Sequence, residues 1–333
     1  MAYDITLIPG DGIGPEVISA TVDIIEAVGV DINWDKVEAG ANTIETEGTP
    51  LPDYVINSIK KNKIALKGPL TTPIGQGFRS VNVSLRKKLD LFANIRPVKS
   101  FNGIPSLHKD VDLIIVRENT EDLYAGVERM IDENRAESIK IITKKASERI
   151  CRYAFQMARD LNRKKVTLVH KANIMKLSDG LFLESGRKIA KDYPDIEFEE
   201  VIVDAMSMKL VQFPQDYDVI VAPNLYGDIL SDLAAGLIGG LGLAPSANIG
   251  EEIALFEPVH GSALDISNKN IANPISAILS GVLMLKHIGQ FDAAVKIERA
   301  LSVVLKDEAN RTMDLGGKQG TKEFAEKVIE KVS

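Results

Sequence analysis

Short runs of apolar, β-branched residues recur along this sequence, and each leads into a charged side chain. Val111–Val116 and Val219–Ala222 are two examples. Runs of this length and composition are typical of strands in a parallel sheet that is covered on both faces. The charged residues that follow these runs are Lys67, Arg117, Lys171, Asp204 and Asp228. Because ligands bind beyond the carboxyl ends of strands in open α/β sheets, the pattern predicts an α/β fold with an open, mostly parallel sheet and a charged site.

A glycine-rich turn near the N-terminus argues against a Rossmann domain. The strand-like run Ile5–Ile8 leads into Gly10, Gly12 and Gly14, and Pro15 then opens a helix. The dinucleotide fingerprint is G-x-G-x-x-G, so the third glycine comes one place early here. The turn can still lie near a ligand, but the sequence does not predict a Rossmann fold.

Asp228 and Asp232 lie four residues apart in a segment with helical spacing. On a helix they project from one face, with Cβ atoms ~6 Å apart. Two carboxylates this close repel unless a cation lies between them, and oxygen ligands suit Mg²⁺ or Mn²⁺. Alternatively, Asp228 caps the helix and Asp232 is a solvated surface charge. The pair by itself leaves both interpretations open.

Bulk properties exclude several classes of function. The net charge of −7 argues against a nucleic-acid partner, since phosphate backbones are bound by clustered Lys and Arg. Cys151 is the only cysteine, and its place in a helical pattern predicts a core residue rather than a nucleophile. No apolar run reaches the ~18 residues of a membrane span, and no leader-like segment precedes the first strand. We therefore expect no membrane partner and a cytoplasmic location.

The middle and final thirds of the chain contain recognisable local patterns. Residues 127–142 alternate in places around the polar turn Asp132–Ala136, which predicts a hairpin arm, and a helix follows from Thr143. Gly236–Gly250 reads as a connector where the chain crosses between domains. The helix around Ile275–Leu285 is so apolar that it is buried in the core or against a second subunit.

Five motifs occur in order along nearly the whole chain. They are Ile8–Glu16 (IPGDGIGPE), Arg117–Glu121 (RENTE), His170–Asn173 (HKAN), Asn224–Asp232 (NLYGDILSD) and Glu257–Gly261 (EPVHG). Through these motifs the chain resembles the β-decarboxylating dehydrogenases of 2-hydroxy acids, the family of isocitrate, homoisocitrate and 3-isopropylmalate dehydrogenases. Several long motifs in the right order are highly specific, so the interpretations of single residues as mere caps or surface charges lose most of their weight.

The resemblance implies a two-domain isopropylmalate dehydrogenase-like fold. Residues 1–98 and 243–333 would form a large cofactor-binding domain, and residues 99–242 a small domain for substrate, metal and dimerisation. A hairpin arm near residues 126–142 would clasp a second copy of the chain. The implied assembly is a homodimer with shared active sites, and a higher oligomer stays open.

The resemblance also implies roles for individual residues. Tyr124 and Lys171 match the family's acid/base pair. The residues that match its substrate-binding positions are Thr72, Ser80, Asn82, Arg86, Arg96 and Arg117. The residues that match its cofactor-binding positions are Glu257, His260, Gly261, Ala263, Asp265, Ile266 and Asn273. Its metal ligands match Asp204, Asp228 and Asp232, with Asp204 and Lys171 entering the site of the other subunit.

Substrate and cofactor are implied by two short segments. Ser80 and Asn82 resemble the positions that hydrogen-bond the γ-carboxylate in isocitrate dehydrogenases, so a small tricarboxylate, isocitrate, is expected; homoisocitrate stays open. Asp265 and Ile266 occupy positions where NADP-using relatives carry Lys and Tyr, and a carboxylate would repel the 2′-phosphate of NADP. The expected cofactors are therefore NAD and a divalent metal.

The implied reaction is oxidative decarboxylation. Hydride passes from C2 of the substrate to the nicotinamide, CO₂ is lost, and Tyr124 protonates the enol carbon while Lys171 assists deprotonation of the hydroxyl. Two other classes remain. A non-catalytic regulatory subunit is expected to lose catalytic or metal residues, which this chain keeps, and a tricarboxylate-binding protein gives no reason for three aspartates and a cofactor loop.

Overall fold

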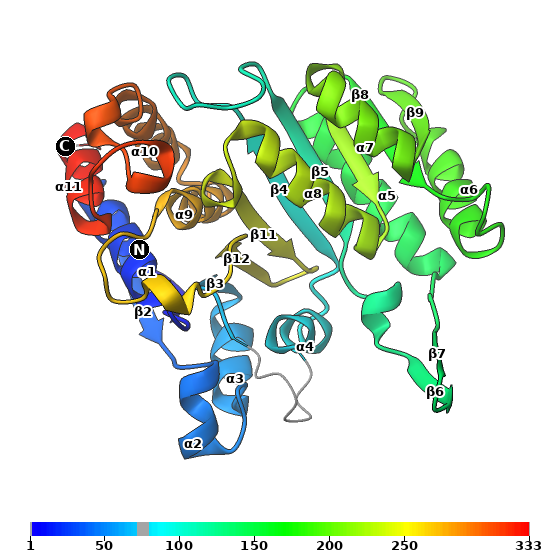
Figure 1. Cartoon of the computed structure of the whole chain (residues 1–333), viewed down its shortest axis with the longest axis horizontal. Coiled ribbons are helices and arrows are strands. Elements are labelled where there is room, and N and C mark those ends of the chain that lie inside the picture. The colour runs from blue at the N-terminus through cyan, green and yellow to red at the C-terminus, as the bar shows by residue number, and fades with distance from the viewer. Residues whose placement is uncertain (1, 72–79, 333) are drawn as a thin grey trace.

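One mixed sheet forms the framework of the molecule. In the computed structural model, which describes residues 2–71 and 80–332, ten strands join in the order β2-β1-β3-β12-β11-β4-β5-β10-β8-β9 (Figure 1). The strands are β1 (Tyr3–Ile8), β2 (Ile32–Lys36), β3 (Ile64–Lys67), β4 (Ala93–Lys99), β5 (Asp112–Glu118), β8 (Lys165–His170), β9 (Glu197–Ile202), β10 (Val219–Ala222), β11 (Pro245–Ile249) and β12 (Ala254–Pro258). The prediction of an open α/β sheet is confirmed.

The two halves of this sheet run in opposite directions. β2, β1, β3 and β12 are mutually parallel, and so are β5, β10, β8 and β9. Between the halves, the pairs β12–β11, β11–β4 and β4–β5 are all antiparallel. Three antiparallel steps in succession reverse the strand direction. The carboxyl ends of the strands therefore do not all meet at one edge, and that part of the argument for a common ligand site is wrong.

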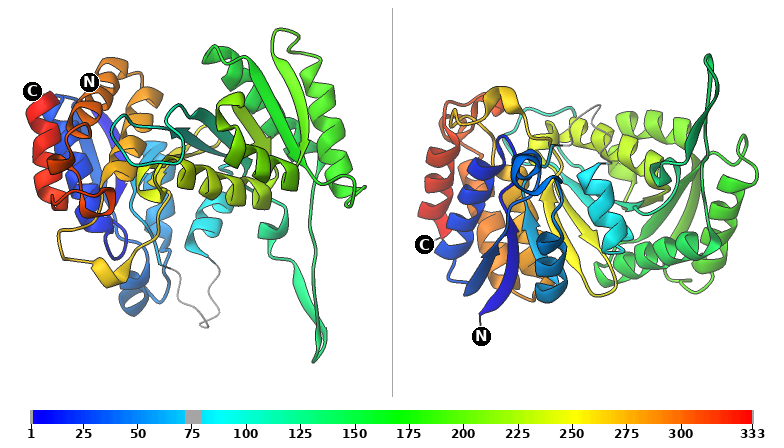
Figure 2. Two further views of the ribbon diagram at one scale, coloured as in Figure 1. Left: turned by 45° about the horizontal axis from the view of Figure 1, so that its top comes forward. Right: turned by 90° about the horizontal axis from the view of Figure 1, so that it is seen from below.

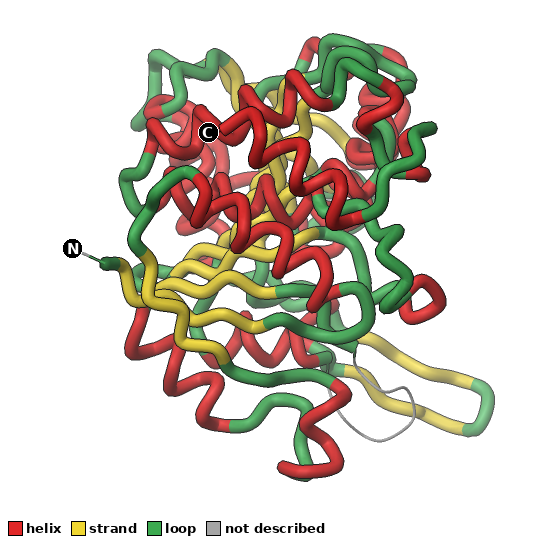
Figure 3. The backbone as a smooth tube through the Cα atoms, turned by 90° about the vertical axis from the view of Figure 1, so that its left-hand side faces the viewer, coloured by secondary structure: helices red, strands yellow, loops and turns green. Residues whose placement is uncertain are grey.

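Helices cover both faces of the sheet (Figures 1 and 3). They are α1 (Gly14–Ala27), α2 (Ile44–Glu47), α3 (Asp53–Asn62), α4 (Val81–Lys88), α5 (Lys144–Asp160), α6 (Ser178–Ala190), α7 (Val203–Gln212), α8 (Asn224–Ile238), α9 (Ile275–His287), α10 (Phe291–Val304) and α11 (Thr321–Val332). The first helix packs against the last, so both chain ends lie in the same half of the molecule. Within the described residues no helix is long and apolar enough to cross a membrane.

The apolar core lies between the sheet and these helices. α9 is buried along most of its length and packs against β11, β12 and α10, so its apolar surface is covered within one chain rather than by a second subunit. Cys151 lies on α5 with no exposed surface, and burial raises the pKa of its thiol. The prediction that Cys151 is a core residue is confirmed.

The predicted hairpin is present and projects far from the body of the molecule (Figure 2). Its strands are β6 (Glu128–Asp132) and β7 (Arg135–Ser138), and every residue of β6 is exposed. Thr143 caps the following helix, because its hydroxyl accepts a hydrogen bond from the Ala146 N–H at 3.2 Å. The prediction that Gly236–Gly250 is a connector is partly wrong, since this segment contains the strand β11.

Candidate active site

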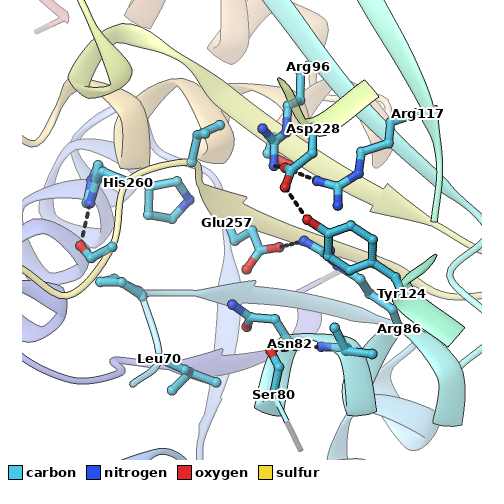
Figure 4. A pocket seen from close by; sticks show the side chains of 16 residues that line it. Leu70, Ser80, Asn82, Arg86, Arg96, Arg117, Tyr124, Asp228, Glu257 and His260 are labelled. Carbon is cyan, nitrogen blue, oxygen red and sulfur yellow. Dashed lines mark hydrogen bonds and ion pairs between the residues drawn. The ribbon is translucent and has the colours of Figure 1, made fainter. Parts of the chain in front are cut away.

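A cavity of about 210 Å³ lies over the central strands, where the two halves of the sheet meet (Figure 4). Its walls come from β4, β5, β12, α4, α8 and the turn before the hairpin. The polar and charged side chains that line it are Ser80, Asn82, Arg86, Arg96, Arg117, Tyr124, Asp228, Ser246, Glu257 and His260. The structure therefore brings together most of the residues that the sequence predicted for a ligand site.

The arginines of the cavity come from three elements. Arg96 lies on β4 and Arg117 on β5, and their side chains share one face because Arg117 pairs with Asn94, two residues before Arg96. Arg86 lies in the last turn of α4. Arg117 is only 1% exposed, and its burial together with the charge of Arg86 lowers its pKa to about 10. Arg117 thus keeps its positive charge at neutral pH.

Asp228 is the point on which these side chains converge. Arg117 and the Tyr124 hydroxyl both donate to its carboxylate, and Arg96 Nη2 lies 3.4 Å from Oδ1. Burial opposes ionisation, but the charge of Arg117, the hydrogen bond from Tyr124 and the charges of the other two arginines together outweigh it and lower the pKa of Asp228. The carboxylate is therefore ionised, and a ligand or cation that approaches it competes with the arginines.

Gly227 explains how α8 comes so close to β5. A Cβ atom at this position would lie 2.7 Å from Cβ of Arg117, which is closer than a real contact allows. The absence of a side chain lets the helix lie against the strand and places Asp228 beside the guanidinium group. The helix begins after Pro223, so Asp228 lies inside the helix and the alternative of a helix cap is wrong.

Tyr124 faces the same cavity from the short helical turn Leu123–Ala125. The Arg117 guanidinium lies 4.9 Å from the centre of its ring. Burial raises the pKa of Tyr124 above its usual value, and its hydrogen bond to Asp228 adds to that effect. The phenol is protonated at neutral pH, which suits a group that donates a proton.

A buried polar network beneath the cavity orients the arginines, and the sequence analysis did not find it. Asn94 Oδ1 accepts from Arg96 Nε at 2.8 Å, and Asn94 Nδ2 donates to Ser246 at 2.8 Å and to Asn248 at 3.0 Å. Asn248 in turn donates to Glu257 Oε1 at 2.7 Å. Alternating polar residues, Asn94 and Arg96 in β4 and Ser246 and Asn248 in β11, were the available signal. In β11 it was hidden inside an apparent connector.

Glu257 links the predicted cofactor residues to the substrate arginines. Its Oε2 lies 2.6 Å from Lys67 Nζ, and its Oε1 lies 3.5 Å from Arg86 Nη2. Burial would raise its pKa, but the adjacent Lys67 and Arg86 outweigh burial and hold it at about 2. A fully ionised carboxylate is thus held between two cations at the floor of the cavity.

The three predicted metal ligands do not meet within one chain. Asp232 follows Asp228 by one turn of α8 and pairs with Arg96 at 2.9 Å. Asp204 lies in the first turn of α7, where it pairs with Lys171. In residues 2–71 and 80–332 no cluster of three metal-ligating side chains is present. The chain therefore supplies Asp228 and Asp232 at one place and Asp204 at another.

Lys171 is also absent from the cavity. It directly follows β8, and its partner Asp204 follows β9, the edge strand of the sheet. The side chains of Lys171 and Asp204 are 24% and 70% exposed. The predicted acid/base pair is thus divided, with Tyr124 inside the cavity and Lys171 on the surface.

The predicted cofactor residues are only partly gathered. Glu257, His260 and Gly261 line the cavity, whereas Asp265 and Ile266 lie in the neighbouring turn Leu264–Ile266. Ala263, just before that turn, has a left-handed backbone with φ of 39°. Asn273 is buried and donates to Asp314 at 2.9 Å. Thr72 lies outside the described residues.

Comparison with known proteins agrees with this geometry. Residues 4–328 match the isocitrate/isopropylmalate dehydrogenase family. The chain belongs to this family. The crystal structure of isocitrate dehydrogenase from Methylococcus capsulatus is 58% identical, covers 99% of both chains and has a TM-score of 0.97. The chain is therefore a dehydrogenase, and the predicted isopropylmalate dehydrogenase-like fold is confirmed.

Two eukaryotic relatives extend the comparison. The alpha subunit of the mitochondrial isocitrate dehydrogenase (NAD) of Homo sapiens is 48% identical over 331 residues, which is 98% of this chain and 90% of the relative. A regulatory subunit of the mitochondrial isocitrate dehydrogenase (NAD) of Dictyostelium discoideum is 51% identical over 330 residues, with 99% and 92% covered.

These relatives contradict the prediction of a cytoplasmic location, because they are mitochondrial proteins. The prediction rested on the expectation that no leader segment precedes the first strand. Such leaders are removed from mature chains, so a sequence without one does not identify a compartment.

Proposed function

We propose that the chain catalyses the NAD-dependent oxidative decarboxylation of isocitrate to 2-oxoglutarate, CO₂ and NADH, with Mg²⁺ or Mn²⁺. The observation that carries the proposal is the cavity in which three buried arginines surround an ionised aspartate and a protonated tyrosine. The name of the Methylococcus capsulatus relative supports isocitrate as the substrate. The names of the two eukaryotic relatives support NAD as the cofactor.

The charges of the cavity fit a tricarboxylate that binds with a divalent cation. Its ionised side chains are Arg86, Arg96, Arg117, Asp228 and Glu257, which sum to one positive charge. A divalent cation would make this cavity more positive, which suits a substrate with several carboxylates. Arginine side chains also grip carboxylates with two parallel hydrogen bonds, so they orient the substrate as well as attract it.

Polar atoms without partners support a ligand in this place. Asn82 Oδ1, Arg86 Nε and His260 Nε2 are buried and have no hydrogen-bond partner within the described part of the chain. Buried polar groups are normally satisfied, so atoms of this kind around one cavity suit a polar ligand. We propose that Asn82, with Ser80 beside it, contacts the γ-carboxylate of the substrate. His260 would face the cofactor.

Asp228 and Asp232 fit a hard divalent cation, because both offer carboxylate oxygens from one face of α8. Asp204 from a second copy of the chain would complete the donor set. When bound, the cation polarises the substrate oxygens and stabilises developing negative charge. The arginines must then yield part of their hold on Asp228, and the substrate carboxylates would take over those guanidinium groups.

The protein's own groups would perform the proton transfers. Tyr124 holds a proton on its hydroxyl at the edge of the cavity, so we assign it to protonation of the substrate carbon after CO₂ leaves. Lys171 of a second chain would assist removal of the hydroxyl proton. Its own chain keeps it outside the cavity, which is why we propose that each active site is built from two chains.

The proposed assembly is a homodimer that the hairpin arm clasps. Val127, Met130 and Ile139 on this arm are apolar and exposed, which suits burial against a partner. We propose that residues 1–98 and 243–333 form the cofactor domain and residues 99–242 the small domain. The reversal of strand direction between β12 and β5 supports this division.

Steady-state kinetics test the proposal directly. The purified chain with Mg²⁺ should form NADH from isocitrate, and rates with homoisocitrate, 3-isopropylmalate and NADP should each be lower. The double change Asp265→Lys and Ile266→Tyr should shift the preference from NAD toward NADP. A higher kcat/KM with homoisocitrate would replace isocitrate as the substrate, and unchanged cofactor preference would remove Asp265 from the cofactor site.

A regulatory role is the second candidate, because the Dictyostelium relative is named as a regulatory subunit. A chain of this kind would bind substrate or effector without turnover. Isocitrate-dependent NADH formation by the purified chain excludes this role, whereas substrate binding in calorimetry without turnover supports it.

A further inference from the structure

Lys140 is held between two buried carboxylates at the base of the hairpin arm. Its Nζ atom lies 2.6 Å from Asp179 Oδ1 and 3.8 Å from Asp122 Oδ1. The side chain of Lys140 is 11% exposed, and those of the two aspartates are fully buried. The ammonium group also lies 4.3 Å from the centre of the Tyr226 ring. One cation therefore stabilises two carboxylates that would otherwise repel each other in a medium of low dielectric constant.

The cluster of Asp122, Lys140 and Asp179 contacts the proposed catalytic tyrosine and the proposed metal-binding helix through Asp122. Asp122 accepts hydrogen bonds from the N–H of Leu123 at 2.8 Å and from the N–H of Leu225 at 3.0 Å. Leu123 opens the turn that carries Tyr124, and Leu225 lies in the first turn of α8, one turn before Asp228. The carboxylate of Asp122 thus fixes Tyr124 and Asp228 relative to each other.

The backbone at Asp122 is disfavoured, which shows how much depends on its side chain. Its φ of 70° lies in the left-handed region that residues other than glycine rarely adopt. The strain is offset by the carboxylate hydrogen bonds and by the backbone hydrogen bond from Asp122 N–H to the Ile141 carbonyl at 2.8 Å. That last bond ties the turn to the segment that follows the second strand of the hairpin arm.

The other end of the cluster reaches Lys171. Asp179, in the first turn of α6, accepts a hydrogen bond from the backbone N–H of Lys171 at 2.7 Å. It therefore fixes the point at which the chain leaves β8 and turns its lysine toward Asp204. Lys140 joins this turn to the turn of Tyr124, although the two catalytic groups lie in different places.

We infer that Asp122, Lys140 and Asp179 form a positioning cluster that couples Tyr124 to Lys171 of the same chain. The inference rests on the proposed function, in which one chain gives Tyr124 to its own active site and Lys171 to the site of its partner. A change in the cluster then disturbs both active sites of a dimer. A change in Tyr124 or Lys171 disturbs only one.

Hybrid dimers with one wild-type and one variant chain, isolated through two different affinity tags, test the coupling. A wild-type/Tyr124→Phe hybrid should retain about half of the wild-type kcat, since one of its two sites is intact. A wild-type/Lys140→Met hybrid should fall well below half, to about one fifth or less, because both sites lose a positioned group. Lys188→Met, which removes an exposed lysine from α6, serves as the matched control and should leave the hybrid fully active.

Further measurements separate positioning from loss of folding. KM for isocitrate should stay within about twofold in Lys140→Met while kcat falls, because the arginines are untouched. Lys140→Arg keeps the positive charge and should recover a large part of kcat. If Lys140→Met does not fold, Asp122→Asn takes its place, since asparagine has nearly the same shape as aspartate and its side-chain oxygen still accepts hydrogen bonds.

The outcomes separate the two ideas. A Lys140→Met hybrid with half of the wild-type kcat would overturn the coupling while the shared site stands, if a hybrid of one Tyr124→Phe chain and one Lys171→Met chain also keeps half of that kcat. Full activity of that hybrid would overturn any positioning role for the cluster. A hybrid of one Tyr124→Phe chain and one Lys171→Met chain keeps one intact site only if the sites are shared, so complete inactivity of that hybrid would instead overturn the shared site, and the coupling with it.

Discussion

Two regions of this molecule pair basic side chains with an aspartate, but the basic side chains are buried in one region and reached by water in the other. Arg96 and Arg117 are buried against Asp228 on the central strands, whereas Lys171 and Asp204 form a pair that water reaches at the edge of the sheet. A buried charge is costly unless it is paired, so the first set is part of the folded structure. An exposed pair contributes little to folding. In the proposed site, Lys171 and Asp204 therefore depend on a second chain for their role, whereas the arginines are in position before any ligand binds.

The largest effect on stability and activity is expected for the buried arginines that pair with Asp228. Arg117→Gln removes a guanidinium group that binds Asp228 and, in the proposed site, a substrate carboxylate. The free energy of unfolding should fall by on the order of 2 kcal/mol, because the partly buried carboxylate of Asp228 loses its main partner. We expect kcat/KM to fall by about 10³-fold or more, since the substrate loses a charge-assisted pair of hydrogen bonds. Urea denaturation and steady-state kinetics measure the two effects.

Arg159→Gln is the matched control for that change. Arg159 pairs with Asp195 on the surface, and both side chains are about half exposed to water. Its loss should alter neither the unfolding curve nor the activity. Equal destabilisation by the two substitutions would remove the distinction between the buried and the exposed regions.

The second effect is a loss of activity without a loss of folding. Lys171→Met should leave the melting temperature unchanged because Lys171 is paired only at the surface, while kcat falls by about 10²-fold through the loss of a general base. Mixed, reassociated Lys171→Met and Arg117→Gln chains should recover about one quarter of the wild-type activity, because half of the dimers would carry one intact site. No recovery on mixing would place both residues in a site built from one chain.

The third effect concerns the contact that would bring the two regions together. Met130→Asp places a charge on the exposed hairpin arm, where Met130 is 64% exposed. If the arm is buried against a partner, the carboxylate disfavours association, and the dimer should dissociate at least tenfold more readily. Light scattering measures the mass and kinetics the activity. A monomer that retains full activity would exclude a shared site.

The comparison also shows what the sequence could predict. Asp228 and Arg117 follow apolar runs within long motifs, so both the strands and their charged residues were found before the structure. The network of Asn94 and Asn248 was not found, because its meaning depends on antiparallel pairing between strands that are distant in the sequence. Local patterns predict elements, but they do not give the direction in which separate strands pair.

The HKAN motif was enough to identify Lys171 in the sequence, whereas the role of Lys171 is a proposal. In the proposed active site Lys171 acts together with a second chain, and no pattern within one sequence describes that contact. Lys140 carries no motif, and its importance is visible only once Asp122 and Asp179 lie on either side of it.

The smallest effect is a difference in pH dependence between two buried glutamates. The pKa of Glu257 is lowered to about 2, because Lys67 and Arg86 outweigh the effect of burial. The pKa of Glu121 is raised to about 7, because burial outweighs its hydrogen bonds from Thr143 at 2.8 Å. The two residues should therefore contribute to stability with opposite signs as the pH changes.

For Glu257 the folded pKa lies below the unfolded value near ~4.5, so its contribution is present above pH ~4.5 and is lost as the pH falls toward ~2. For Glu121 the folded pKa lies above the unfolded value, so stability is greatest below pH ~4.5 and declines as the pH rises through ~7. Glu121→Gln should therefore remove a decline of about 1 kcal/mol between pH 5 and 8, a value reduced for partial contact with solvent. Urea denaturation at several pH values measures the decline. An unchanged decline in Glu121→Gln would show that Glu121 is ionised in the folded protein at pH 5, as Glu257 is.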